Sequence, residues 1–352
     1  MRRTALLAVA ATLLGSLATA PAAHADGPHG PYGQGLGHCA STGTGTLACH
    51  VDVAPGTYDV TVTLGGETAG ATAISGETRR TLLAETPTEA GERLRRSFTV
   101  DVRDPEGEPT GPTGTPGLDL VIGGTAPRVT SLRITPAPAA RRLFLVGDST
   151  VCDQPGEPYV GWGQLLPAHL MRGVAVANHA DSGESTVSFL AHPALFDRVE
   201  QRIRPGDPVL IQLAHNDKQT DAPTYRANLT TLVERVRAKG GEPVLVTPVV
   251  RRWFNADGTL DNGTALLVNG LGVDHPAEIR ALAARLGTPL IDLTALTKAL
   301  VEQWGPEASK ALYLTAEKRD NTHTSVRGAA EYAALVAAEL RTQGILPGSL
   351  IR

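Results

Sequence analysis

The chain has 352 residues, of which 19% are charged and 4% aromatic, and its formal net charge at pH 7 is -4. This length exceeds that of one typical domain and suits two. Because Lys and Arg are not in excess and form no run with interleaved aromatic residues, the composition excludes nucleic acid as the expected partner.

The beginning of the chain is typical of an export signal. Arg2 and Arg3 provide a positive start, residues 5–20 are apolar or small, and residues 23–25 (AHA) have the small-x-small form of a cleavage site. The apolar run is short for a bilayer span and no later segment is longer, so we expect no membrane anchor. We therefore predict a signal peptide at residues 1–25 and a secreted, extracellular mature protein.

Residues 26–136 are predicted to form an all-β sandwich. Apolar and polar residues alternate in segments such as 58–64 (YDVTVTL) and 97–102 (SFTVDV), which is the pattern of half-buried strands. Breakers rich in Gly and Pro, as at residues 108–114 (EPTGPTG), suit the turns of an antiparallel fold.

Three cysteines in an exported chain allow one disulfide and one remaining thiol. Cys39 and Cys49 are close in sequence and are the candidates for the disulfide. Cys152 then remains, and we interpret it as a small buried residue rather than a nucleophile, because a serine three residues earlier is the better candidate.

After a short, stiff linker at residues 136–140 (PAPAA), strand and helix patterns alternate through residues 141–352. Helical patterns separate apolar runs that we predict as buried parallel strands. These runs are residues 143–146, 174–177, 209–213, 244–246 and 289–291. This order predicts a flavodoxin-like, three-layer α/β/α domain, in which sites form at the carboxyl ends of the strands.

Side chains with useful chemistry follow the predicted strands at that edge. Ser149 stands on the turn after the first strand, and residues 178–185 lead from the second strand into a helix whose backbone N–H groups can face an oxyanion. Asn216 follows the third strand, where its amide can donate to the same oxyanion. Asp320 and His323 share one turn before the last helix.

An activated serine needs an imidazole to take its proton and a carboxylate to hold the tautomer of that imidazole. Ser149, His323 and Asp320 provide these three groups. Each of them also has an ordinary structural role when taken alone, because Gly-Asp-Ser is common in turns and histidines are common on surfaces. Their joint order on matching strand ends favours the catalytic interpretation.

These segments resemble, in order and spacing, the conserved blocks of the SGNH (GDSL-like) hydrolase superfamily. Ser149, Gly183, Asn216 and His323 match the serine, glycine, asparagine and histidine of that pattern, with Asp320 three residues ahead of the histidine. The resemblance implies a catalytic triad of Ser149, Asp320 and His323, and an oxyanion hole formed by Ser149, Gly183 and Asn216.

Within that superfamily the chain is similar to rhamnogalacturonan acetylesterases, which remove acetyl groups from pectin. The similarity lies in residues 147–150 (GDST), 161–164 (GWGQ), 215–217 (HND) and 320–325 (DNTHTS). Two positions depart from the pattern. Ala214 stands where many members have glycine, and Glu184 stands where an arginine often follows the oxyanion glycine.

The resemblance implies no metal or organic cofactor. His179 and His215, with neighbouring aspartates, form no pair of ligands at helical spacing, so we predict no metal site. Arg251, Arg252 and Trp253 follow a predicted strand end and are candidates for binding an acidic sugar.

We therefore expect a secreted, monomeric serine esterase that removes O-acetyl groups from a pectic polysaccharide or oligosaccharide. One alternative is an SGNH esterase or lipase acting on other short-chain or lipid esters. A second alternative is a secreted carbohydrate-binding protein without turnover. The β-rich N-terminal region resembles, in pattern only, the galactose-binding-like sandwiches that accompany such enzymes.

Overall fold

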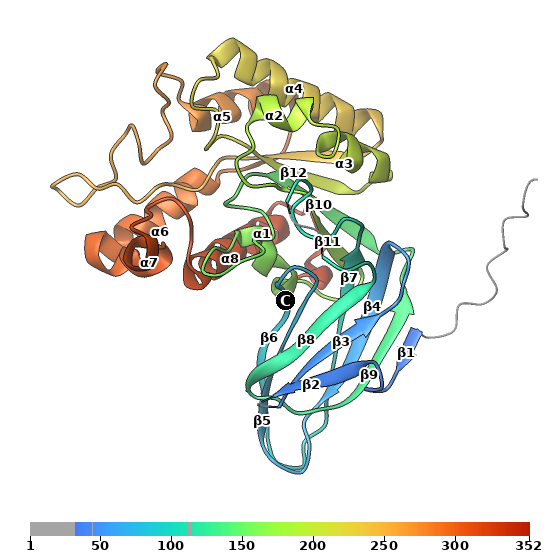
Figure 1. Cartoon of the computed structure of the whole chain (residues 1–352). Helices are drawn as coiled ribbons and strands as arrows, with labels where there is room; N and C mark the ends of the chain where they lie inside the picture. The colour runs from blue at the N-terminus through green and yellow to red at the C-terminus, as the bar shows by residue number, and fades with distance from the viewer. Residues whose placement is uncertain (1–31, 44, 112–113) are drawn as a thin grey trace, which may run out of the picture.

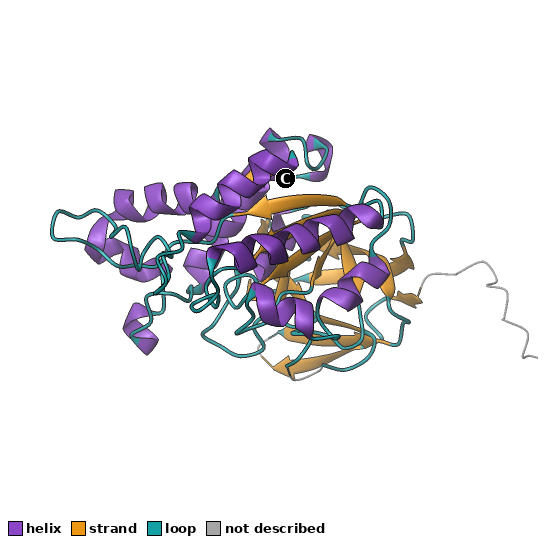
Figure 2. Cartoon of the chain, turned by 90° about the horizontal axis from the view of Figure 1, so that it is seen from above, coloured by secondary structure: helices purple, strands orange, loops and turns teal. Residues whose placement is uncertain are grey.

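The structure is a computed structural model that describes residues 32–352 except residues 44, 112 and 113 (Figure 1). The predicted signal peptide at residues 1–25 lies outside the described residues. The described chain consists of an N-terminal β region and a C-terminal α/β region (Figures 1 and 2).

The N-terminal β region contains two antiparallel sheets that enclose one core. The four-stranded sheet contains, in spatial order, β1 (Tyr32–Gln34), β9 (Val129–Pro136), β4 (Gly56–Leu64) and β7 (Leu94–Val102). The five-stranded sheet contains β2 (Cys39–Gly43), β3 (Thr46–Val51), β8 (Leu118–Ala126), β5 (Gly70–Gly76) and β6 (Arg80–Thr88). The all-β prediction for this part of the chain therefore agrees with its antiparallel sheets.

A disulfide joins the first two strands of the five-stranded sheet. Cys39 and Cys49 face each other directly across the pairing of β2 with β3, and their sulfur atoms are bonded. The α/β region contains the third cysteine, Cys152, as a buried free thiol.

The α/β region is built on a five-stranded sheet in which every pair is parallel. Its spatial order is β11 (Val174–Asn178), β10 (Arg141–Gly147), β12 (Pro208–Gln212), β13 (Glu242–Val246) and β14 (Leu290–Ile291). This is the flavodoxin-like order. The strand that follows β10 in sequence, β11, lies on one side of it, and the later strands are added on its other side.

Helices cover both faces of the parallel sheet (Figure 1). One face packs against α2 (Thr186–Ala191), α3 (Phe196–Arg202), α4 (Ala222–Ala238) and α5 (His275–Leu286). The other packs against α1 (Trp162–Leu165), α6 (Leu293–Ala308) and α8 (Val326–Thr342). The short α7 (Thr315–Lys318) and the 3-10 turns η1 (Leu166–His169), η2 (Ser309–Leu312) and η3 (Gly348–Leu350) complete the region.

The helix boundaries have local causes. Asp221 and Asp274 cap the N-termini of α4 and α5 by accepting backbone N–H groups three residues later, and each is followed by a proline in the first turn. Gly287 ends α5 in the left-handed conformation, with φ 55°. All five residues of β11 and of β12 are buried because helices lie on both sides of them.

Ion pairs with buried carboxylates join the two regions. Arg80 at the start of β6 is 1% exposed and pairs with Asp153, which lies in the turn after β10, at 2.6 Å. Asp101 of β7 pairs with Arg202 at the end of α3, also at 2.6 Å. Since unpaired buried charges are costly, these pairs fix how the β region sits on the α/β region.

Within the part of the chain that the structure describes, no helix has the length and apolar character needed to span a bilayer.

Candidate active site

The structure brings together the serine, histidine and aspartate that the sequence places on separate segments. Ser149 lies directly after β10, whereas Asp320 and His323 lie between α7 and α8. The Oγ of Ser149 is 2.9 Å from Nε2 of His323, and Nδ1 of His323 is 2.6 Å from Oδ2 of Asp320. These distances are those of two consecutive hydrogen bonds in a serine–histidine–carboxylate relay.

The side chain of Asp320 stabilises the turn that carries Asp320 and His323. Oδ1 of Asp320 accepts the backbone N–H groups of Thr322 at 2.7 Å and His323 at 3.0 Å. Burial alone raises the pKa of Asp320, but the hydrogen bonds from His323 and Thr322 outweigh burial and hold the pKa below its ordinary value. The aspartate is therefore ionised throughout the neutral range.

The ionised aspartate determines which nitrogen of His323 carries the proton. A carboxylate only accepts hydrogen bonds, so Nδ1 of His323 donates to Asp320 and Nε2 presents a lone pair to Ser149. In this tautomer His323 accepts the hydroxyl proton of Ser149. The relay can therefore activate the serine as a nucleophile.

Within the described residues, each expected oxyanion donor keeps one N–H hydrogen without an internal acceptor. Among the described residues, none accepts the backbone N–H of Ser149 or of Gly183. One hydrogen of the Asn216 amide donates to the carbonyl oxygen of Glu184 at 3.1 Å, which orients the amide and leaves its second hydrogen available. Gly183 has φ 83°, a left-handed conformation that glycine adopts without strain.

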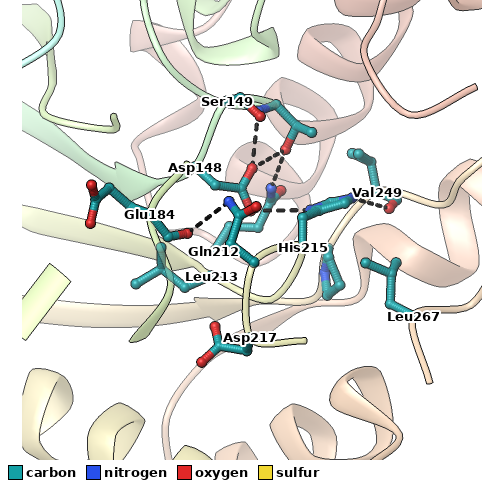
Figure 3. Close-up of polar contacts among 12 residues, drawn as sticks. Asp148, Ser149, Glu184, Gln212, Leu213, His215, Asp217, Val249 and Leu267 are labelled. Carbon is teal, nitrogen blue, oxygen red and sulfur yellow. Dashed lines mark hydrogen bonds and ion pairs between the residues drawn. The ribbon is translucent and has the colours of Figure 1, made fainter. Parts of the chain in front are cut away.

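A second histidine, His215, contacts the residue that precedes the nucleophile. Nδ1 of His215 lies 3.1 Å from Oδ2 of Asp148, and Nε2 of His215 lies 3.1 Å from the carbonyl oxygen of Val249 (Figure 3). Oδ1 of Asp148 accepts both the backbone N–H and the hydroxyl of Thr150. Asp148 thereby holds the turn that carries Ser149.

The charge of Asp148 is compensated within the protein. Burial raises its pKa, but the charge and hydrogen bond of His215, together with the bonds from Thr150, lower the pKa below its ordinary value. The sequence motif at residues 215–217 thus combines three different structural tasks. His215 contacts Asp148, Asn216 contacts Glu184, and Asp217 accepts the backbone N–H of Thr186 at the start of α2.

Several residues beside the triad were not found from the sequence. The ring of Tyr159 meets that of His323 edge to face, with ring centres 5.4 Å apart. The guanidinium of Arg79, from the β region, donates to the carbonyl oxygens of Gln154 and Tyr159. No local pattern could have indicated these contacts, because they join segments that are far apart in the sequence.

The comparisons with known proteins agree with this geometry. Residues 145–331 match the model of the GDSL-like Lipase/Acylhydrolase family. The chain belongs to that family. It is 39% identical over 220 residues to the rhamnogalacturonan acetylesterase RhgT of Bacillus subtilis, an alignment that covers 58% of this chain and 91% of RhgT.

Two further relatives come from the same organism. The probable rhamnogalacturonan acetylesterase YesY of Bacillus subtilis is 31% identical over 224 residues, covering 60% of this chain and 99% of YesY. The crystal structure of YxiM from Bacillus subtilis superposes with a TM-score of 0.53 at 28% identity, covering 85% of this chain and 81% of that chain. The present GDSL-like protein is therefore an esterase, and its similarity to YxiM extends over most of both regions.

The three residues predicted to line the rim of the esterase site differ in their surroundings. Trp253 is 49% exposed. Arg251 is half-buried and donates from Nη2 to the carbonyl oxygen of His215 at 3.2 Å, next to the site. Arg252 is buried, and its guanidinium contacts Ser309, Asn321 and the carbonyl oxygen of Pro306. Arg252 therefore holds the loop of the triad from inside, whereas Arg251 is half-buried and Trp253 is exposed.

The remaining candidate residues, Cys152 and His179, make contacts typical of residues with a structural role. Cys152 is fully buried, and burial together with the neighbouring carboxyl of Glu108 raises the pKa of its thiol well above the ordinary value. Nε2 of His179 accepts a hydrogen bond from the guanidinium of Arg202, and the ring of His179 stacks on Phe144. Across the described residues, no three His, Cys, Asp or Glu side chains are placed to hold a metal ion.

Proposed function

We propose that the protein is a secreted serine carbohydrate esterase that removes O-acetyl groups from pectin. The observation that carries the proposal is the relay from Ser149 through His323 to Asp320, with distances of 2.9 and 2.6 Å. The relay supports an esterase that turns over rather than a binding protein. The names of RhgT and YesY support the substrate class.

The proposed reaction proceeds by acyl transfer through the serine. Ser149 Oγ attacks the acetyl carbonyl carbon while His323 Nε2 takes the hydroxyl proton, and the carbonyl electrons move onto the oxygen. The N–H groups of Ser149 and Gly183 and the amide of Asn216 donate to that oxyanion. The oxyanion then collapses, and the sugar oxygen leaves with the proton from His323. Water, deprotonated by His323, attacks the carbonyl carbon of the acetyl-enzyme. The bond between that carbon and Ser149 Oγ then breaks, Oγ takes the proton from His323, and acetate is released.

Charge at the rim favours a pectic substrate over a neutral one. A rhamnogalacturonan backbone carries uronate carboxylates, for which the guanidinium of Arg251 is a planar partner. Unsubstituted xylan has no such charge. Because ion pairs near a surface contribute only about 0 to 1 kcal/mol, we expect a modest preference that weakens with added salt.

The deciding experiment compares acetate release from acetylated rhamnogalacturonan and acetylated xylan at equal acetyl content. We expect faster release from rhamnogalacturonan, and a smaller preference in Arg251→Ala than in the matched control Arg285→Ala, which alters an exposed arginine in the last turn of α5. Equal or faster release from xylan, or a preference for long-chain 4-nitrophenyl esters over acetate esters, would contradict the pectin assignment.

The location, oligomeric state and N-terminal classification belong to the same proposal. We propose export through residues 1–25, a monomer in solution, and a galactose-binding-like sandwich in the β region. The two antiparallel sheets around one core support that classification. N-terminal sequencing of protein from culture medium and light scattering test the first two points. A mature N-terminus at Met1 or a stable dimer would overturn them.

A further inference from the structure

A loop of the β region reaches the segment that carries the oxyanion glycine. Glu108, in the connection between β7 and β8, is 7% exposed, and its Oε1 accepts the backbone N–H of Ser182 at 2.8 Å. The same oxygen accepts the thiol of Cys152 at 3.0 Å. Two residues later, the backbone N–H of Thr110 donates to Oδ2 of Asp181 at 2.7 Å.

Side-chain hydrogen bonds also restrain the contacted segment: Nε2 of Gln154 donates to Oγ of Ser182 at 3.3 Å, and the amide of Asn216 donates to the carbonyl oxygen of Glu184 at 3.1 Å. The backbone N–H groups have fewer partners. At one end, the N–H of Asp181 bonds to the carbonyl oxygen of Gly147, and at the other, the N–H of Thr186 bonds to Asp217. Between these ends Ser182 and Gly183 are exposed, and a Cβ placed on Gly183 would meet no atom within 4 Å. Among the described residues, Glu108 is the acceptor that holds the backbone N–H of Ser182.

The position of the Ser182 backbone matters because the next peptide group carries the expected oxyanion donor, the N–H of Gly183. An oxyanion hole depends on donors held at hydrogen-bond distance from the oxygen before the reaction begins. A glycine at positive φ with nothing packed against it is free to rotate, so the preceding peptide must be anchored to aim its N–H. The N–H of Ser182 is already used by Glu108, which leaves that of Gly183 for the substrate.

We propose that Glu108, supplied by the N-terminal β region, is a positioning residue of the esterase reaction that anchors the peptide of Ser182 and thereby aims the N–H of Gly183 at the acyl oxygen. This inference rests on the proposed role of Ser149 and Gly183. It does not depend on the identity of the sugar.

The dependence on another region distinguishes this chain from RhgT. The alignment covers 91% of RhgT but 58% of this chain, so RhgT is too short to contain a counterpart of the whole β region. In the present protein, by contrast, Glu108 and Thr110 of the β region form hydrogen bonds with Ser182 and Asp181, directly before Gly183. The β region is therefore a component of the enzyme and does not act as a separately tethered module.

The charge of Glu108 is an unfavourable feature for this reaction, which makes the geometric role testable. A negative charge close to a developing oxyanion raises the energy of the transition state. Glu108→Gln keeps an oxygen at the same reach and removes the charge, whereas Glu108→Asp keeps the charge and withdraws the oxygen by one methylene group. Glu108→Ala removes the acceptor entirely.

A contact at the amino ends of the parallel strands provides a matched control. The backbone N–H of Gly173, just before β11, donates to Oγ1 of Thr99 in β7 at 2.9 Å. This is also a bond from a backbone N–H of the α/β region to a side-chain oxygen of the β region. Thr99→Val breaks it far from the carboxyl ends of the strands, together with the hydrogen bond from Oγ1 of Thr99 to Oδ1 of Asp59 at 2.6 Å. The variant therefore reports what the loss of hydrogen bonds at this junction does to stability, away from the reacting groups.

The experiment measures kcat and KM for 4-nitrophenyl acetate, together with the thermal midpoint, for all four variants. We expect Glu108→Ala to lower kcat by about 10- to 100-fold, below the full cost of an oxyanion donor, with KM within about threefold of wild type. Glu108→Asp should resemble Glu108→Ala, Glu108→Gln should retain kcat within about threefold of wild type, and Thr99→Val should leave kcat unchanged.

Two results would overturn the positioning role. One is a kcat for Glu108→Ala and Glu108→Asp equal to that of Thr99→Val, which would reduce Glu108 to a structural contact. The other is a larger loss in Glu108→Gln than in Glu108→Asp, which would make the charge decisive. If Glu108→Ala does not fold, the comparison of kcat between Glu108→Gln and Glu108→Asp still tests the positioning role. Activity remaining in Ser149→Ala would instead refute the proposed site, separately from Glu108.

Discussion

The two regions of the molecule place their loops differently, and this difference explains where the reacting groups lie. In the α/β region all strands run parallel, so the turns after β10, β11 and β12 meet at one edge of the sheet. In the β region the strands are antiparallel, so successive turns alternate between the two ends. The parallel region therefore collects Ser149, Gly183 and Asn216 at one place.

The β region contributes side chains to the edge that the parallel region builds. Arg79, Arg80 and Glu108 all contact turns that follow β10 or β11. None of them belongs to the triad. A region without reacting groups can thus take part in catalysis by restraining the loops that carry those groups, and the following variants separate the two contributions.

Loss of the nucleophile should have the largest effect, and only on the chemistry of the α/β region. We expect Ser149→Ala to lower kcat for 4-nitrophenyl acetate by about 10⁴-fold or more, because the step that forms the acetyl-enzyme is lost. The thermal midpoint should stay near that of wild type. The control Ser41→Ala removes an exposed hydroxyl of the β region and should change neither quantity. Activity of Ser149→Ala within tenfold of wild type would refute the assignment.

Breaking the ion pair between the regions should mainly affect stability. Arg80→Met leaves Asp153 buried without its cation, which typically costs about 3 to 5 kcal/mol in the free energy of unfolding. Chemical denaturation measures this quantity. The double variant Arg80→Met with Asp153→Asn removes both charges and should recover part of the loss. A single variant as stable as wild type would show that the pair does not hold the regions together.

The amide of Asn216 should matter for turnover and little for stability. If it donates to the oxyanion, Asn216→Ala lowers kcat by about 10² to 10³. Asn255→Ala, which removes an exposed amide away from the triad, serves as the control. Should the variant raise KM and leave kcat intact, Asn216 would bind substrate and would not stabilise the transition state.

The last prediction concerns the pH dependence of stability and a carboxyl group of the β region at the junction. Burial raises the pKa of Glu77 from 4.5 to about 8. The folded state then binds more protons than the unfolded state between these values, so this group makes stability fall as pH rises from about 4.5 to about 8, by at most about 1.4 kcal/mol per pH unit.

Glu77→Gln removes that slope, and its thermal midpoint should exceed that of wild type more at pH 8 than at pH 5. The exposed Glu67→Gln is the control and should show no such trend. A difference between Glu77→Gln and wild type that does not change between the two pH values would show that the carboxyl of Glu77 is not protonated by burial.

Strand and helix patterns were sufficient to predict most elements of the α/β region. The predicted strand at residues 143–146 lies inside β10, and that at residues 174–177 lies inside β11. The patterns are strong because strands covered on both faces are apolar throughout. Arg252 shows where such reasoning ends, since an arginine after a strand can point to solvent or to the interior, and hydrogen bonds with Ser309 and Pro306 decided the matter.

By itself the sequence determined the triad candidates, because a serine, an asparagine and a linked aspartate and histidine follow strand and helix patterns in a recognisable order. It also determined the change from antiparallel to parallel architecture, since the period of hydrophobicity changes after residue 136. Only the tertiary structure decided that Glu108 holds Ser182, that Arg79 holds Tyr159, and that His215 contacts Asp148. Such contacts join residues that no local pattern connects, and their energy depends on distances that exist only once both regions are folded against each other.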